Sequence, residues 1–149
     1  MKTRYQAAIL QGSQLLLIRH HEFASGREYW VIPGGGREES DESEEQAVAR
    51  EALEETGLQV SVERLLFSQP VEQIAGYERV YQEHKTYLCR VLGGTAAPGY
   101  EPEPEASSLY EINAVGWFDL TNPGSWGAAG EDRFTGPLLR RIKETMPGE

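Results

Sequence analysis

Residues 33 to 58 read PGGGREESDESEEQAVAREALEETGL and predict most of the local structure that matters in this chain. The first part is a glycine-rich turn, in which Pro33 precedes three consecutive glycines. The second part, from Glu44 to Thr56, is rich in the strong helix formers Glu, Gln, Ala, Arg and Leu. A glycine-rich turn beside clustered carboxylates is a geometry that can hold a divalent cation against a chain of phosphates.

The ends of the predicted helix are marked by its own sequence. Ser43 suits the N-cap, and Gln46 follows three residues later and can reach back to complete a capping box. Gly57 stands where a helix commonly ends in a left-handed residue. The sequence therefore predicts a helix over residues 44 to 56.

Three glutamates of this helix, Glu51, Glu54 and Glu55, have helical spacing. At about 100° per residue they fall within an arc of roughly 100°, so they share one face. A bound cation would relieve the repulsion between them, and a solvated acidic face is the ordinary alternative in an acidic chain. The opposite face is expected to pack against the core. Its residues are Val48, Ala49, Ala52, Leu53 and Thr56.

The charged and glycine positions of this stretch are Gly36, Glu42, Arg50, Glu51, Glu54, Glu55 and Gly57, followed by the aliphatic Leu58. In this spacing they resemble the signature of the Nudix hydrolases, which cleave nucleoside diphosphates linked to another moiety. Residues 29–36 look like the lead-in to that signature, and residues 116–118 look like a later strand of the family. One departure is Ala52, where the family usually has a larger aliphatic residue. The smaller side chain of Ala52 should only reduce the packing between the helix and the core.

The resemblance implies a fold and a site. The fold is an α/β/α sandwich with a mixed central sheet, in one domain over residues 1–149. Glu54 and Glu55 are expected to bind metal, and Glu51 to bind metal or to act as the base that activates water. The backbone carbonyl of Gly35 or Gly36 is a further expected ligand, and both glycines would let the backbone approach phosphate. Such oxygen ligands suit Mg²⁺ or Mn²⁺.

Other residues of the signature have expected supporting roles. Gly57 ends the helix, and an ion pair of Arg50 with Glu42 or Glu51 would hold the loop against it. A direct contact of Arg50 with phosphate is the alternative. Arg19 and Arg27 flank the loop before the glycine turn and are candidates for phosphate contacts, although a lone arginine is more often a surface residue.

A last catalytic glutamate is expected on the loop before the strand that contains Trp117. Glu111 is favoured, and its alternative role is that of a solvated loop carboxylate. The competing acidic residues are Glu101, Glu103 and Glu105. His20 and His21 are expected in a loop without a metal role. Tyr29, Tyr77 and Tyr81 are expected in the core more than against a base.

The composition of the chain excludes several classes of protein. The 149 residues are 39% apolar and carry a net charge of −10, which fits one domain and leaves no basic stripe for binding a nucleic acid polymer. The N-terminus has no hydrophobic signal segment, and no apolar run has membrane-spanning length, so a cytoplasmic protein without a membrane partner is expected. The single cysteine, Cys89, excludes an internal disulfide and is expected to be a small core residue.

Strands are predicted over residues 5–10 and 14–19 as a hairpin, and over 29–32, 58–67, 79–92 and 114–120. Pro137 fits the first turn of a C-terminal helix predicted over residues 138–146. Loops are expected over residues 20–28, 97–105 and 121–136. Strands and helices interleave without regular βαβ spacing, which favours a mixed sheet with helices on its faces.

The predicted function is metal-dependent hydrolysis of a phosphoanhydride bond in a small nucleotide. Candidate substrates are ADP-ribose or another sugar nucleotide, a nucleoside triphosphate and a dinucleoside polyphosphate. The loops at residues 20–28, 70–79 and 97–110 are expected to select among them. The alternative is a non-catalytic Nudix-fold module that binds a nucleotide. Monomer and homodimer both stay open.

Overall fold

The computed structural model describes residues 2–71, 80–100 and 107–146. The elements in chain order are β1 (Thr3–Gln11), β2 (Gln14–Glu22), β3 (Glu28–Val31), β4 (Gly34–Gly35), α1 (Glu44–Thr56), β5 (Leu58–Pro70), β6 (Glu83–Gly94), β7 (Tyr110–Asp119), the 3₁₀ turn η1 (Pro123–Ser125), α3 (Ala128–Glu131) and α4 (Thr135–Thr145).

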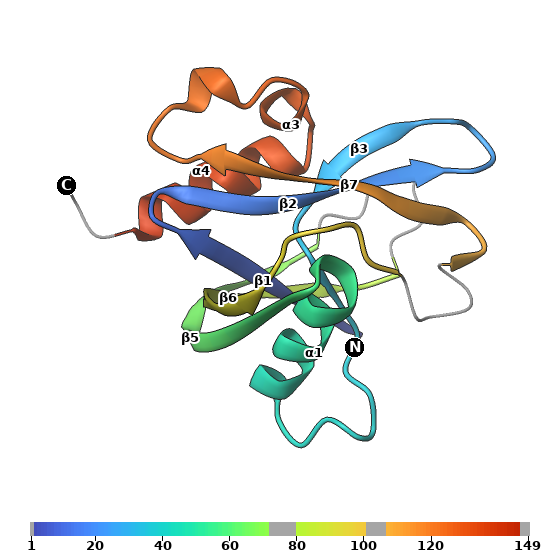
Figure 1. Ribbon diagram of the computed structural model, residues 1–149, viewed down its shortest axis with the longest axis vertical. Coiled ribbons are helices and arrows are strands. Elements are labelled where there is room, and N and C mark those ends of the chain that lie inside the picture. The colour runs from blue at the N-terminus through green and yellow to red at the C-terminus, as the bar shows by residue number, and fades with distance from the viewer. Residues whose placement is uncertain (1, 72–79, 101–106, 147–149) are drawn as a thin grey trace.

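These strands form a mixed sheet in the order β3-β2-β1-β6-β5, with β4 paired to β1 and β7 paired to β2. β1 runs parallel to β6, and the other pairs are antiparallel. The β1–β2 register begins at the Gly12 turn and comprises Leu10↔Leu15 and Gln11↔Gln14. Away from this turn β1 pairs with β4 and β2 pairs with β3, so the two strands separate, while β6 and β7 pair along nearly the whole length of β1 and β2, respectively (Figure 1).

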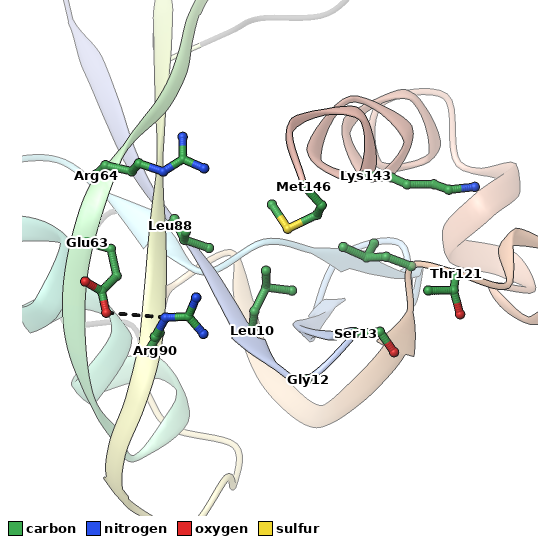
Figure 2. A pocket seen from close by; sticks show the side chains of 11 residues that line it. Leu10, Gly12, Ser13, Glu63, Arg64, Leu88, Arg90, Thr121, Lys143 and Met146 are labelled. Atoms are coloured by element: carbon green, nitrogen blue, oxygen red, sulfur yellow. Dashed lines mark ion pairs between the residues drawn. The ribbon is translucent and has the colours of Figure 1, made fainter. Parts of the chain in front are cut away.

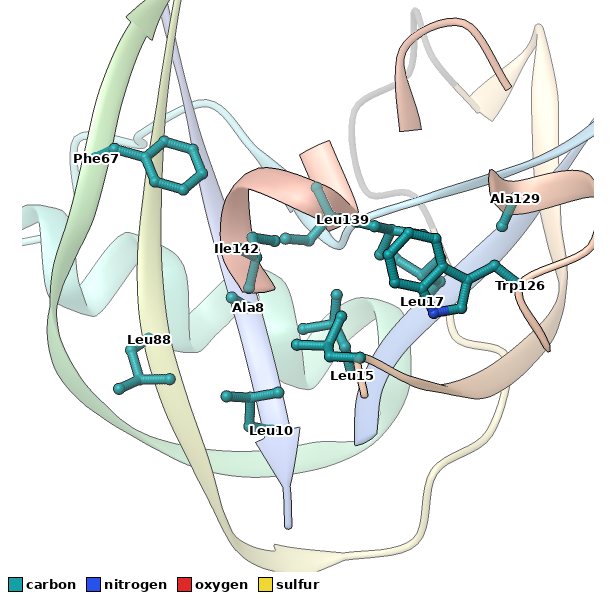
Figure 3. Packing of buried hydrophobic residues seen from close by; sticks show 12 residues of the cluster. Ala8, Leu10, Leu15, Leu17, Phe67, Leu88, Trp126, Ala129, Leu139 and Ile142 are labelled. Carbon is teal, nitrogen blue, oxygen red and sulfur yellow. The ribbon is translucent and has the colours of Figure 1, made fainter. Parts of the chain in front are cut away.

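Helix α1 covers one face of the sheet, and α3 and α4 cover the other (Figure 1). This confirms the expected α/β/α sandwich. On the α4 side, Leu139 and Ile142 pack with strand residues such as Leu15, Leu17 and Phe67 (Figure 3). On the α1 side, Val48 and Ala52 pack with a second cluster that contains Ile9, Leu16 and Cys89. Cys89 is fully buried, as the sequence predicts, and burial raises the pKa of its thiol to about 12.

Several predicted boundaries are shifted. β2 continues to Glu22, so the expectation that His20 and His21 lie in a loop is wrong. β7 begins at Tyr110, which places Glu111 inside a strand. Both extensions have one cause: the end of β2 pairs with the start of β7 through His20↔Ile112 and His21↔Glu111. Such pairing satisfies backbone groups of polar residues that local sequence assigns to loops.

No helix in the described part of the chain is both long and apolar enough to cross a membrane. The predicted start of a strand at residue 79 lies outside the described residues, as does Tyr77.

Candidate metal and phosphate site

Helix α1 has the ends that its sequence predicts. Ser43 is the N-cap, and its hydroxyl accepts a hydrogen bond from the Gln46 amide at 3.1 Å. The Gln46 side chain reaches back one residue further than in a standard capping box, to the Glu42 amide. Gly57 closes the helix with φ 77°, and its amide donates to the Leu53 carbonyl. Both ends of the acidic helix are therefore fixed by local hydrogen bonds.

The predicted division of α1 into a core face and a carboxylate face is wrong. Glu51 and Glu55 are each only 1% exposed, whereas Leu53 is 48% exposed. Val48, Glu51, Ala52, Glu55 and Thr56 follow the i, i+3, i+4, i+7, i+8 spacing of a buried helical stripe. The two glutamates therefore lie in the middle of the buried stripe, and Glu54 lies at its border with 15% of its side chain exposed.

The buried carboxylates face the glycine turn. The amide of Gly34 donates to Glu55 Oε1 at 2.8 Å. A Cβ atom on Gly35 would come within 2.5 Å of Glu51 Oε1, so only glycine allows this approach. The pairs Tyr5↔Gly35 and Gln6↔Gly34 hold the turn against β1. The role of these glycines is therefore to bring backbone and carboxylates together in a buried layer.

Arg50 joins the turn to the helix. Its guanidinium lies within 3.0–3.5 Å of four carboxylates. These carboxylates belong to Glu38, Asp41, Glu51 and Glu54. Arg50 also donates a hydrogen bond to the Gly36 carbonyl at 3.0 Å. Glu51 is one of the two partners expected from the sequence, but the loop partner is Asp41 in place of Glu42, which is exposed. Asp41 is 5% exposed and precedes Glu42 directly, so charge and position were visible in the sequence while burial was not.

The charges of this cluster are unbalanced, because one guanidinium faces four carboxylates and Glu55 lies beside them. Burial opposes the charge of Arg50, but the hydrogen bonds that it donates to Asp41 and Glu54, together with the charge of Glu51, raise its pKa above the usual value. The hydrogen bond from Arg50 lowers the pKa of Asp41. Arg50 and Asp41 are therefore both ionised at neutral pH.

The donor atoms fit a hard divalent cation. Glu54 Oε2 is buried and accepts no hydrogen bond from the described residues, which is costly for a carboxylate oxygen unless a cation compensates it. In the present arrangement no three His, Cys, Asp or Glu side chains of the described residues converge as metal ligands. Arg50 Nη1 lies instead between Glu51 and Glu54, at 3.1 Å from each. Binding a cation there therefore requires these carboxylates to turn away from Arg50.

The C-terminal end of α1 is tied down by the segment that follows β6. The amides of Gly99 and Tyr100 donate to the carbonyls of Glu55 and Glu54 at 2.9 and 3.1 Å. A Cβ atom on Gly99 would lie 1.9 Å from the Glu54 carbonyl. Gly99 is therefore a positioning residue that the sequence, read as a Pro/Glu-rich exposed loop, did not reveal.

A pocket of about 290 Å³ opens beside the glycine turn. We call it the aromatic pocket, because six of its lining residues carry rings: His20, Tyr29, Tyr81, His84, Tyr110 and Phe134. The His20 ring stacks on Tyr110, with centroids 4.1 Å apart, and is 5% exposed. Burial, with a smaller contribution from the charge of Arg4, lowers the pKa of His20 to about 3. This wall of the pocket is therefore uncharged at neutral pH.

The other residues expected at the site lie elsewhere. Arg19 donates to Asn113 at 2.9 Å, and Arg27 pairs with Glu22 at 3.4 Å and lies over the Tyr29 ring. Glu111 is exposed in β7, opposite His21. Its competitors Glu101, Glu103 and Glu105 lie outside the described residues. A role for Arg19, Arg27 or Glu111 in the reaction therefore stays a prediction.

A larger cavity, of about 750 Å³, lies on the α4 side of the sheet (Figure 2). Leu10, Leu88 and Met146 contribute apolar surface, and Arg64 and Arg90 project toward it from β5 and β6 (Figure 2). The described residues that line it include none from the glycine turn or from α1. Its size therefore does not make it the candidate for phosphate chemistry, because the oxygen ligands are on the other side of the sheet.

Comparison with known proteins agrees with this geometry. A family model described as NUDIX domain matches residues 1–137. The chain therefore belongs to the NUDIX family.

Three individual proteins that resemble this chain share with it at most about a third of the aligned residues. The NAD-capped RNA hydrolase NudC of Vibrio atlanticus is 33% identical over 115 residues, which are 77% of this chain and 36% of that protein. The chain thus spans about a third of the length of this relative. An ADP-ribose pyrophosphatase of Streptococcus suis is 27% identical, with a TM-score of 0.62 and coverage of 99% of this chain and 93% of the other. A NUDIX hydrolase of Nitrosomonas europaea is 20% identical, with a TM-score of 0.68 and coverage of 96% and 88%, and it shows the fold alone.

Proposed function

We propose that the protein hydrolyses the pyrophosphate bond of a nucleoside diphosphate derivative with the help of Mg²⁺ or Mn²⁺. The observation that carries this proposal is the cluster of four carboxylates around Arg50, beside a glycine turn whose backbone can approach phosphate. Glu51, Glu54 and Glu55 would hold the cation together with the carbonyl of Gly35, and the cation would neutralise phosphate charge and lower the pKa of water.

The residues of the chain divide the remaining work. Glu51 is buried and close to Gly35, so it can bind metal or accept the proton of the attacking water. Arg50 keeps the turn and helix in register through Gly36 and Asp41. Gly57 and Gly99 fix the end of the helix that carries Glu54 and Glu55.

Among the candidate substrates, we favour a compound in which pyrophosphate joins a nucleoside to a second moiety. Two relatives are named for substrates with such a linkage, an ADP-ribose pyrophosphatase and a NAD-capped RNA hydrolase. Nucleoside triphosphates and dinucleoside polyphosphates remain the comparison substrates. The NudC relative acts on capped RNA, so capped RNA belongs in the same panel. A cytoplasmic location, and a single domain over the whole chain, stay predictions of the sequence.

The test is release of phosphate and nucleotide from this panel with Mg²⁺, comparing wild type with Glu54→Gln. The variant removes a charge from the border of the buried stripe, so turnover should fall by about 100-fold or more while the fold is kept. Glu45→Gln, an exposed glutamate on the same helix, is the matched control and should keep wild-type turnover. Full activity in chelator, or unchanged hydrolysis by Glu54→Gln, would refute the metal assignment. Wild type that binds nucleotides without cleaving any of them would favour the binding-module alternative.

A further inference from the structure

Arg4 is a partly buried arginine at the edge of the aromatic pocket. Its Nε donates to Gln6 Oε1 at 3.1 Å, and its Nη2 donates to the Ile32 carbonyl at 2.7 Å. Both acceptors are neutral. Within residues 2–71, 80–100 and 107–146, no carboxylate forms an ion pair with it. A partly buried cation of this kind is costly unless an anion compensates it.

Arg4 lines the aromatic pocket from β1, the strand that also pairs with the glycine turn. It lines the pocket with Gln6 and Ile32, two residues that adjoin the glycine turn through β-pairing and sequence. Burial opposes its charge, but the negative potential of Glu55, and more weakly that of Glu51, helps to raise its pKa. Arg4 therefore stays charged, and it lies within the electrostatic influence of Glu55, one of the candidate metal ligands.

The pocket beside Arg4 suits a flat uncharged ring. Tyr29, Tyr81, Tyr110 and Phe134 supply aromatic surface, on which any nucleobase can stack. Its volume of about 290 Å³ is at the lower end of the range for small-molecule sites, so it can take one nucleoside and not two. Gln6 and Ile32 hold the guanidinium of Arg4 in place, which leaves Nη1 without a hydrogen bond to the described residues.

We propose that Arg4 binds the phosphate of a nucleoside 5′-phosphate group whose base lies in the aromatic pocket. This inference rests on the proposed function, because it places the nucleoside half of the substrate on the β1 side of the glycine turn and the scissile bond beside α1. Arg4 would then act as a specificity residue, which distinguishes substrates by the half that carries a base next to a phosphate. The other moiety lies outside the pocket and is less restricted.

The test measures binding without hydrolysis, by calorimetric titration in Mg²⁺. The probes are the four common nucleoside monophosphates, their nucleosides and ribose 5-phosphate, none of which contains an anhydride bond. For at least one base, wild type should bind the monophosphate at least about tenfold more tightly than the nucleoside or ribose 5-phosphate. Arg4→Gln should lower the affinity for the monophosphate by about tenfold or more, and its affinity for the nucleoside should stay within about twofold of the wild-type value.

Two further variants separate a ligand contact from a structural role. Arg4→Lys keeps the charge but loses the planar fork, so its affinity should lie between those of wild type and Arg4→Gln. Arg64→Gln removes an exposed arginine at the larger cavity and should bind like wild type. Arg4→Gln loses the hydrogen bonds to Gln6 and Ile32, so the melting temperature of each protein without ligand serves as its own reference. The monophosphate should raise the melting temperature of wild type and not that of the variant.

The outcomes distinguish this inference from the proposed function. Equal monophosphate affinity in wild type and Arg4→Gln would overturn it, and so would ribose 5-phosphate binding as tightly as any monophosphate. Arg4-dependent binding in a protein that hydrolyses none of the panel would support the inference while refuting the hydrolase proposal. Hydrolysis that Arg4→Gln leaves unchanged in KM and kcat would refute the inference alone.

Discussion

Helices α1 and α4 cover opposite faces of one sheet, but the stripes that they bury differ in chemistry. α4 buries Leu139 and Ile142, both with 0% exposure, in a cluster of aliphatic and aromatic side chains. α1 buries Glu51 and Glu55 in the same kind of stripe, beside Val48 and Ala52. Apolar burial stabilises a fold, whereas buried carboxylates reduce stability unless partners compensate them. A charged stripe on a buried helix face is therefore a sign of ligand chemistry.

The same contrast applies to the two cavities. The larger one, on the α4 side, combines apolar walls with exposed basic residues, and the smaller aromatic pocket adjoins the glycine turn. Of the two, the smaller pocket is lined by Arg4, which forms no ion pair with the described residues, and by Gln6, which pairs with the glycine turn. Proximity to groups that need a partner is thus a better guide to the site than volume.

Replacing a carboxylate of the α1 stripe should break function and spare stability. Glu55→Gln keeps an oxygen to accept the Gly34 amide but removes one of two buried charges at i, i+4 spacing. Turnover should fall by about 100-fold or more, while the melting temperature stays unchanged or rises. Steady-state kinetics and calorimetry on one preparation check both. A large fall in melting temperature would mean that the carboxylate is a structural element.

Replacing an apolar residue of the α4 stripe should do the reverse. Leu139→Ala leaves a cavity in the core, so unfolding should become easier by about 2–5 kcal/mol. Turnover well below the new melting temperature should match wild type, because Leu139 belongs to neither the carboxylate cluster nor the lining of the aromatic pocket. Denaturant titration gives the free energy of unfolding, and Lys143→Ala, at an exposed position of the same helix, is the control. Lost turnover in folded Leu139→Ala would show that the two faces are coupled.

The glycine turn can be tested by a single methyl group. Gly35→Ala would place a Cβ atom 2.5 Å from Glu51 Oε1, so either the turn or the carboxylate must move. Stability should fall by about 1–3 kcal/mol and turnover should fall with it. Gly124→Ala, whose Cβ would lie 3.5 Å from Asn122 Oδ1, should change neither quantity. Wild-type kinetics in Gly35→Ala would argue against a fixed carboxylate at this position.

Buried His20 in the aromatic pocket should make the stability of the protein sensitive to acid. His20 has a folded-state pKa of about 3, below its ordinary value of 6.5, so it binds its proton in the unfolded state first. Stability should therefore decrease as the pH falls from about 6.5 toward 3, by at most about 1.4 kcal/mol per pH unit from this residue. His20→Phe keeps the stacking on Tyr110 and should flatten the profile. Parallel pH profiles in both proteins would refute the assignment.

Local sequence signals predicted the helix of the site well. Ser43 and Gly57 mark its ends by hydrogen bonds that span only a few residues, and such short-range bonds can be read from spacing. The face that it buries was predicted wrongly. Glu51 and Glu55 were assigned to an exposed face because carboxylates are usually solvated, and that rule fails where a glycine turn packs against them.

The sequence by itself determined the family, the helix with its caps and the buried cysteine, and it supplied the prediction of which residues ligate a cation. These follow from residue type and from spacing along one element. Only the tertiary structure decided that Asp41 replaces Glu42 as the partner of Arg50, that Gly99 holds the end of α1, and that Arg4 lies at the aromatic pocket. Each of these joins segments on different elements, and such contacts are set by how strands pair and faces pack, which local propensity does not encode.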